Sequence, residues 1–161
     1  MNILITAAGE GTRFLKEGIK PPKPLIKVLG IELLIWSLKS FNFEPKDKIY
    51  IVTLAKHKVK KILSNKINTL YPNNEISWLE LIQPKNGQLL SALEAIRFFK
   101  LRNSLLIHNC DTHYSCDLKE IKDLLKKDSN FGIIPCFNSE GDNWSFVRTM
   151  NESSSTAIEV K

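Results

Sequence analysis

The stretch "AAGEGTRF", residues 7–14, directly follows the apolar run Ile3-Leu4-Ile5. A short apolar run bounded by glycines is typical of a buried strand, here predicted over residues 2–6. Gly9 and Gly11 permit positive φ angles, so successive N–H groups of the loop can converge on an anion. Arg13 adds a permanently charged guanidinium that suits phosphate. The stretch therefore predicts a strand that ends in an anion-binding loop, with a tight turn and a surface arginine as the alternative.

The rest of the chain alternates between strand-like and helix-like periodicity. Strands are predicted over residues 2–6, 48–54, 76–82, 104–108 and 131–137, and helices over 33–41, 56–66, 88–99 and 118–127. Residues 144–150 and 156–160 predict a β-hairpin. Strands that alternate with helices favour a mostly parallel sheet with helices on both faces. We therefore predict an α/β, three-layer α/β/α, Rossmann-like fold, in one domain over 1–161.

Composition limits the classes of partner. The net charge of +6 comes from basic residues spread along the chain, without an aromatic and basic module typical of nucleic-acid binding. No apolar run approaches the roughly 18 residues of a membrane span. Three cysteines without the dense spacing of a secreted scaffold favour a reducing compartment. We predict a cytoplasmic protein that binds neither nucleic acid nor membrane, with homo-oligomerisation left open.

A second unusual loop is "KPPKPLIKVLG", residues 20–30. The prolines on both sides of Lys23 stiffen the segment and hold this lysine in a defined direction. The connection is also longer than is usual in compact α/β proteins, and such loops are often functional. A rigid connector with a solvated lysine is the alternative.

Two later loops follow predicted strands and would reach the same edge of the sheet, because parallel strands end together. They are "QPKNGQLLSAL", which begins at Gln83, and "HNCDTHY", which contains Asp111. An aspartate at a strand exit suits Mg²⁺, although it is otherwise often a turn or helix cap. The sequence leaves a zinc site open as an alternative, and its candidate ligands are His108, Cys110, His113 and Cys116.

Together these motifs carry a resemblance. "AAGEGTRF", followed by "PKPLI", resembles the G-x-G-T-R…P-K-P signature of the sugar-phosphate nucleotidyltransferases, which include glucose-1-phosphate thymidylyltransferase and its uridylyl and cytidylyl relatives. "QPKNG" resembles the Q-x-x-x-G stretch of the same family. The resemblance implies the nucleotidyltransferase version of the predicted fold. It also implies transfer of a nucleoside monophosphate from a nucleoside triphosphate to a sugar 1-phosphate, with release of pyrophosphate, in nucleotide-sugar and surface-polysaccharide biosynthesis.

The resemblance assigns roles to individual residues. Arg13 would neutralise the departing pyrophosphate, Lys23 would contact phosphate groups at the reacting centre, and Asp111 would coordinate Mg²⁺. Gln83 and Gly87 would read the base, with a pyrimidine favoured because an amide both donates and accepts hydrogen bonds. The residues that would hold the nucleoside triphosphate in the glycine-rich loop are Ala7, Ala8, Gly9, Gly11 and Thr12.

The sequence departs from the family in two respects. Ala8 stands where many members have glycine, and members run well past 200 residues, with an acceptor-binding half and a second metal-binding aspartate that this sequence does not show. We therefore expect the N-terminal, nucleotide-binding part of a longer enzyme, inactive or weakly active alone. A reduced enzyme that completes its site by dimerising is the alternative.

The sequence leaves two other functions open. The first is a non-catalytic nucleotide-binding module, and the second is a cytidylyltransferase that acts on phosphocholine or another phosphomonoester. Triphosphate hydrolysis is less favoured because the G-x-x-x-x-G-K-[ST] loop is missing. A dinucleotide-dependent oxidoreductase is disfavoured because G-x-G-T-R differs from G-x-G-x-x-G.

Overall fold

The computed structural model describes residues 1–115, 117–127, 132–141, 145–151 and 156–160. The chain divides into two compact units, Met1–Lys122 and Asp123–Lys161. The expectation of one domain over 1–161 stays a prediction.

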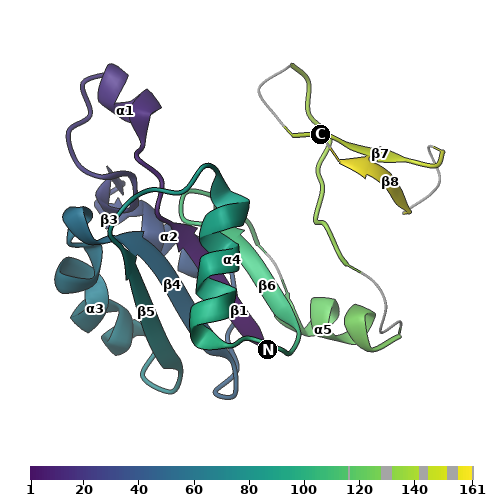
Figure 1. The fold of residues 1–161 in the computed structure, drawn as a ribbon. Coiled ribbons are helices and arrows are strands. Elements are labelled where there is room, and N and C mark those ends of the chain that lie inside the picture. The colour runs from purple at the N-terminus through teal and green to yellow at the C-terminus, as the bar shows by residue number, and fades with distance from the viewer. Residues whose placement is uncertain (116, 128–131, 142–144, 152–155, 161) are drawn as a thin grey trace. The chain divides into compact units, whose positions relative to one another are not determined.

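A parallel sheet of four strands forms the centre of the first unit (Figure 1). The strand order is β5-β4-β1-β6, and every pairing within it is parallel. The predicted strands in this unit are confirmed to within one residue at each end. Their bounds are β1 Asn2–Ala7, β4 Lys48–Leu54, β5 Glu75–Leu81 and β6 Leu105–Asn109.

Helices cover both faces of this sheet, which confirms the predicted three layers. Successive side chains of a strand point to opposite faces. Accordingly, Ile3 and Ile5 of β1 pack in a buried cluster with two helices, whereas Leu4 packs in a separate cluster with a third helix. The first two are α2, Leu33–Leu38, and α3, Val59–Leu70, and the third is α4, Gln88–Phe99.

Two helices differ from their predicted bounds. The helix predicted over 56–66 is divided into the 3₁₀ turn η2, Ala55–His57, and α3, because Lys58 adopts a left-handed φ of 52°. The helix predicted over 33–41 ends at Leu38. Phe41 lies beyond it as a buried side chain, and its ring packs edge-on against that of His108 with 4.9 Å between centroids.

The long connection between β1 and α2 has short elements of its own. Its bounds are α1 Thr12–Lys16, the 3₁₀ turn η1 Lys23–Leu25, and the antiparallel pair β2 Lys27–Val28 and β3 Ile31–Glu32. The turn between β2 and β3 places both Leu29 and Gly30 at positive φ, as a tight hairpin turn requires.

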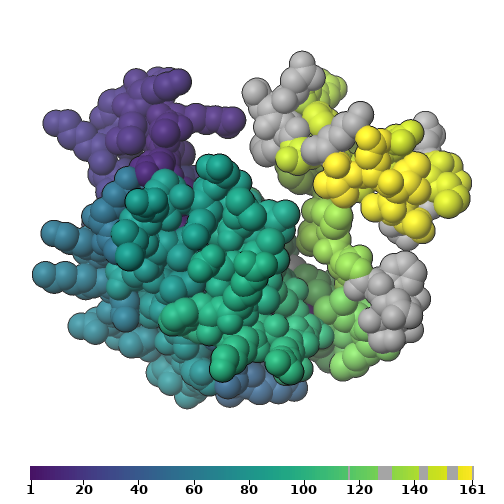
Figure 2. Space-filling view, viewed as in Figure 1, coloured from purple at the N-terminus to yellow at the C-terminus, as the bar shows by residue number. Residues whose placement is uncertain are grey.

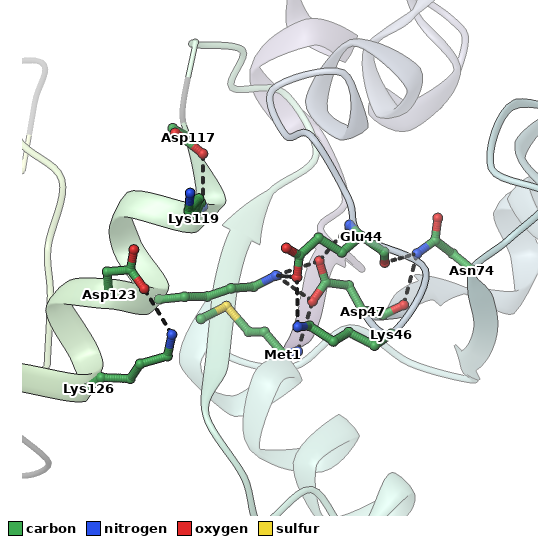
Figure 3. A network of polar contacts seen from close by, with 10 residues as sticks. Met1, Glu44, Lys46, Asp47, Asn74, Asp117, Lys119, Asp123 and Lys126 are labelled. Atoms are coloured by element: carbon green, nitrogen blue, oxygen red, sulfur yellow. Dashed lines mark hydrogen bonds and ion pairs between the residues drawn. The ribbon is translucent and has the colours of Figure 1, made fainter.

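A buried polar network fixes the start of β4 (Figure 3). Asp47 is fully buried, and its carboxylate lies 2.8 Å from both the amino group of Met1 and Nζ of Lys122. Burial alone would raise the pKa of Asp47, but the hydrogen bonds from Lys122 and the Met1 amino group outweigh it and lower this pKa. Asn74 Nδ2 donates to the carbonyl oxygens of Glu44 and Asp47, which ties this corner to the turn before β5.

The helix predicted over 118–127 is confirmed as α5, Leu118–Lys127. In the second unit, the predicted hairpin is also confirmed, as β7 Val147–Thr149 paired antiparallel with β8 Ala157–Val160. Trp144, at the start of the predicted range, lies outside the described residues.

The strand predicted over 131–137 is wrong for residues 132–137, which form no strand. Pro135 lacks the N–H that a ladder needs, and Gly132 weakens a strand. Ile134 and Phe137 are 50% and 68% exposed, so the run has no buried face. Phe131 lies outside the described residues. None of the helices in the described ranges is long and apolar enough to cross a membrane.

Candidate functional site

A cavity of about 330 Å³ opens at the carboxyl edge of the sheet in the first unit. Its wall combines the end of β1 and the loop after it, η1, the residues after β6, and the start of α4. Loops that the sequence singled out separately therefore meet at one place, as the topology of a parallel sheet predicts.

The glycine-rich loop contributes Ala7, Ala8 and Gly9 to this wall. Gly11 is not one of the lining residues and precedes α1 with a φ of 68°. A Cβ added at Gly11 would lie 3.4 Å from Cβ of Lys23. Gly11 therefore allows the loop to pack directly against Lys23, in a conformation that favours glycine.

Lys23 extends into the cavity from η1, which begins after Pro22. Its Nζ lies 2.6 Å from Oδ2 of Asp111, and the two side chains are 28% and 30% exposed. Nζ also lies 5.9 Å from the ring centroid of Phe14. The structure thus brings together two residues that the sequence analysis took from separate motifs.

Among the residues that the structure describes, Asp111 is the one carboxylate in the cavity wall. The described ranges contain no group of three or more His, Cys, Asp or Glu side chains that could hold a metal ion. A cation here would share Asp111 with Lys23 and would take its other ligands from phosphate oxygens and water. Mg²⁺ tolerates such a site, because it binds through one or two carboxylates plus substrate phosphates and water.

The residues of the zinc alternative are engaged otherwise. His108 Nε2 lies 3.0 Å from the carbonyl oxygen of Thr112, and His113 Nδ1 lies 2.9 Å from that of Trp36. Cys110 is buried in the cluster with α2 and α3. Cys116 lies outside the described residues. The described part of the proposed ligand set does not form a zinc site.

Charge in the wall favours an anion. Lys23 and Lys85 oppose the single charge of Asp111, and the Lys85 ammonium lies 3.4 Å from a carboxylate oxygen of Glu94.

Burial raises the pKa of the Cys110 thiol to about 12, with the charge of Asp111 acting in the same direction. The thiol is therefore neutral at physiological pH.

The two residues predicted to read a base are separated. Gly87 lines the cavity and precedes α4 with a φ of 101°, whereas Gln83 is not part of the wall. Gln88 lines the cavity instead, and its Nε2 donates to Oγ1 of Thr6 at 2.9 Å. Thr6, Gln88 and Ser91 line the cavity but were not among the predicted site residues. Helical spacing from Gly87 would have placed Gln88 and Ser91 on one face at the start of α4.

Arg13 and Thr12 are not brought into the cavity. Both are exposed on α1, outside the wall. The role expected of Arg13 stays a prediction, and the geometry described here rests on Lys23 and Asp111.

The fold was compared with known proteins. No protein-family model matches the sequence, and no curated protein matches it. Solved structures do match. A nucleoside-diphosphate-sugar pyrophosphorylase from Vibrio cholerae RC9 gives a TM-score of 0.69 at 20% identity, over 99% of this chain and 66% of that one.

Two further structures agree. A candidate glucose-1-phosphate thymidylyltransferase from Bacillus anthracis gives a TM-score of 0.59 at 20% identity, over 79% of this chain and 50% of that one. A UDP-glucose pyrophosphorylase complexed with UDP-glucose gives a TM-score of 0.56 at 19% identity, over 80% of this chain and 54% of that one. The chain has the fold of these enzymes and spans about half to two thirds of their length.

Proposed function

We propose that the cavity binds a nucleoside triphosphate. We also propose that the chain is part of a nucleotidyltransferase, an enzyme that transfers a nucleotidyl group to a sugar 1-phosphate and releases pyrophosphate. The observation that carries the proposal is the meeting of Lys23 and Asp111, 2.6 Å apart, in a cavity that the glycine-rich loop also lines. The shared fold with sugar-nucleotide pyrophosphorylases supports the same reaction class.

Phosphate recognition follows from the polar groups in the wall. The ammonium of Lys23 supplies a charge that suits a phosphate oxygen. The N-terminus of α4, a helix of 12 residues, opens at Gly87 in the same wall and favours negative charge. A triphosphate would therefore be stabilised from two directions.

Mg²⁺ is the proposed cofactor, and Asp111 is the residue that would hold it. When bound, the cation would neutralise charge on the triphosphate. Lys23 would offset the repulsion between the attacking phosphate and the α-phosphate, and the wall would hold the two reactants in line. No covalent enzyme intermediate is required.

The base, the acceptor, the pathway and the cellular compartment are proposals as well. A pyrimidine nucleotide is favoured, in keeping with the UDP-glucose and thymidylyl names of two structural neighbours. Sugar 1-phosphate is the favoured acceptor, with phosphocholine or another phosphomonoester as the alternative. We place the reaction in nucleotide-sugar biosynthesis in the cytoplasm, and a homo-oligomer is compatible with it.

A non-catalytic nucleotide-binding module is the second candidate. It is favoured by one observation, which is that Asp111 is the single carboxylate of the wall in the described part of the chain, while Arg13 lies outside the wall. A site built this way would bind a triphosphate without completing the transfer.

One experiment separates these functions. The protein is incubated with each common nucleoside triphosphate, Mg²⁺ and a panel of sugar 1-phosphates and phosphocholine, while binding and pyrophosphate release are measured. We expect binding, and pyrophosphate release that falls at least about tenfold in Lys23→Ala. Binding without pyrophosphate release would favour the module. Absence of binding to any nucleotide would contradict both.

A further inference from the structure

The loop that carries Asp111, residues 110–114, follows β6 and lies against the C-terminal end of α2. This end of α2 is on the face of the sheet opposite α4, the helix that covers the sheet in the view of Figure 2. Oγ of Ser37 holds the start of the loop, because it donates to the carbonyl oxygen of Asn109 at 2.7 Å. Two histidines hold the rest, and the motif "HNCDTHY" places one on each side of Asp111.

His113 connects the loop to α2. Its Nδ1 lies 2.9 Å from the carbonyl oxygen of Trp36 and 3.2 Å from Oγ of Ser40. In a continued helix the N–H of Ser40 would reach that carbonyl oxygen, but it donates to the carbonyl oxygen of Ser37 instead. Because a carbonyl oxygen can only accept, the proton lies on Nδ1 of His113. The loop therefore supplies the donor that the end of α2 lacks, and Oγ of Ser40 accepts a second hydrogen bond, from the N–H of Tyr114.

His108 makes a corresponding contact inside the loop. It is buried, and its Nε2 lies 3.0 Å from the carbonyl oxygen of Thr112, so this ring carries its proton on Nε2. Its ring packs edge-on against the rings of Phe41 and Tyr114, with 4.9 and 5.3 Å between centroids. The two histidines thus hold the two residues directly after Asp111, and they do so through different ring nitrogens.

We propose that His113 and His108 are positioning residues for the cation site, because they fix on α2 the loop that presents the Asp111 carboxylate. This inference rests on the proposed function. Mg²⁺ demands near-ideal octahedral geometry, so its carboxylate ligand must be held closely. Residues that orient a ligand without touching the metal typically change metal affinity tenfold or more. The ring nitrogens that make these contacts carry protons, so they do not ligate the cation themselves.

The test uses inorganic tripolyphosphate as the probe and compares its affinity in EDTA with that in Mg²⁺ by isothermal titration calorimetry. The ratio of the two affinities, here the cation gain, measures what the cation contributes. His113→Ala should reduce the cation gain by about tenfold, while the affinity in EDTA changes less than about twofold.

Amide variants separate a positioning role from a structural one. His113→Asn should restore the cation gain, because the amide nitrogen of asparagine is attached to Cγ, as Nδ1 is. His113→Gln, whose amide lies one bond further out, should not. The pattern reverses at His108, where glutamine places its N–H near the position of Nε2. His108→Gln should therefore keep the cation gain and His108→Asn should lose it.

Two controls accompany these variants. Lys39→Ala removes an exposed side chain at the same end of α2 and should change neither affinity. Thermal unfolding checks that each variant is folded.

The protonated nitrogens provide a readout that needs no ligand. In ¹⁵N NMR spectra of the imidazole rings at pH 8, where an ordinary histidine is neutral, His113 should carry its proton on Nδ1 and His108 on Nε2. A proton on Nε2 of neutral His113 would contradict the contact with Trp36 and overturn the inference.

The outcomes separate the inference from the proposed function. An unchanged cation gain in His113→Ala would overturn the inference, and so would equal losses in His113→Asn and His113→Gln. In both cases the proposed function stands if Asp111→Asn, measured alongside, loses the cation gain. An unchanged cation gain in Asp111→Asn, or failure of the wild-type protein to bind tripolyphosphate, would contradict the proposed function itself.

Discussion

Nζ of Lys23 lies 2.6 Å from Oδ2 of Asp111, so the residue proposed to bind phosphate and the residue proposed to bind the cation neutralise each other in the free protein. A triphosphate without a metal must compete with Asp111 for Lys23. Asp111→Asn should therefore bind metal-free nucleotide more tightly, by up to about fivefold, because a partly exposed ion pair contributes at most about 1 kcal/mol. The same variant should lose the gain in affinity that Mg²⁺ gives the wild-type protein. Calorimetry in EDTA and in Mg²⁺ measures both effects.

The control for this variant is Glu10→Gln. It removes the same charge from the glycine-rich loop, where Glu10 pairs with Lys56 at 2.6 Å outside the cavity wall. Equal gains in the two variants would attribute the effect to net charge and not to the ion pair.

The reverse experiment removes the lysine. Lys23→Met should weaken nucleotide binding at least about tenfold, yet bind Mg²⁺ or Mn²⁺ alone more tightly, because Asp111 is then released. Titration of Mn²⁺ without nucleotide, followed by electron paramagnetic resonance, measures the second effect. Lys27→Met, which removes an exposed lysine beyond η1, is the control. Unchanged Mn²⁺ affinity would show that Lys23 does not restrain Asp111.

Gly11 supports the position of Lys23. Gly11→Ala would strain a backbone at φ 68° and bring a methyl group into contact with Cβ of Lys23 at 3.4 Å. Nucleotide affinity should fall by about tenfold. Gly18→Ala isolates the strain, because Gly18 has a similar φ of 76° but an added Cβ would meet no atom within 4 Å. If the two variants lose the same nucleotide affinity, the contact with Lys23 is not the cause of the loss.

Asp47 should control stability in acid. Its pKa is lowered in the folded state from an ordinary value of 3.8, so its contribution is present above that pH and is lost as the pH falls through the folded-state pKa. Asp47→Asn should lower the free energy of unfolding by about 3 kcal/mol at pH 7, since Lys122 and the Met1 amino group lose a buried partner. The difference from the wild-type protein should shrink below pH 4.

Urea unfolding at several pH values measures this difference. Glu75→Gln removes an exposed ion pair with Lys48 and should leave the free energy of unfolding nearly unchanged at every pH. A constant difference between Asp47→Asn and the wild-type protein from pH 7 to pH 3 would exclude Asp47 as the titrating group.

The cysteines should differ in reactivity. The pKa of Cys110 is raised to about 12 by burial, whereas Cys136 is exposed. At pH 7.5 iodoacetamide should modify Cys136 and leave Cys110 unmodified, because the thiolate is the reactive form. Peptide mass spectrometry assigns the sites, and unfolding in guanidinium should equalise them. Rapid alkylation of Cys110 in the folded protein would show that it is accessible.

Much of the fold is predictable from the sequence because local periodicity and burial agree in the first unit. Apolar runs such as Ile49-Tyr50-Ile51-Val52 are buried on both faces, as a parallel sheet with helices on each side demands. The strand predicted at residues 132–137 is wrong because local periodicity and burial do not agree there. An apolar run alone predicted a strand there, although Pro135 and Gly132 disfavour one.

The candidate site was predictable only in part. Motifs indicated Lys23 and Asp111, and the topology predicted that their loops would meet. Gln88 lines the cavity, whereas Gln83 does not. This was not predictable from motifs, because it depends on which turn of the connection reaches Thr6. The exposed position of Arg13 likewise depends on the path of the loop around α1, for which the sequence carries no periodic signal.

The most direct test of nucleotide binding in this cavity is ¹H–¹⁵N NMR of the protein titrated with CTP, UTP, dTTP, ATP and GTP in Mg²⁺. At least one nucleotide should shift the amide signals of Ala8, Gly9, Lys23, Gly87 and Asp111, which line one cavity. Shifts that gather instead around Asn2, Lys48 and Asn103, which line a separate cavity at the other end of the strands, would contradict the proposed site. So would a spectrum that no nucleotide changes.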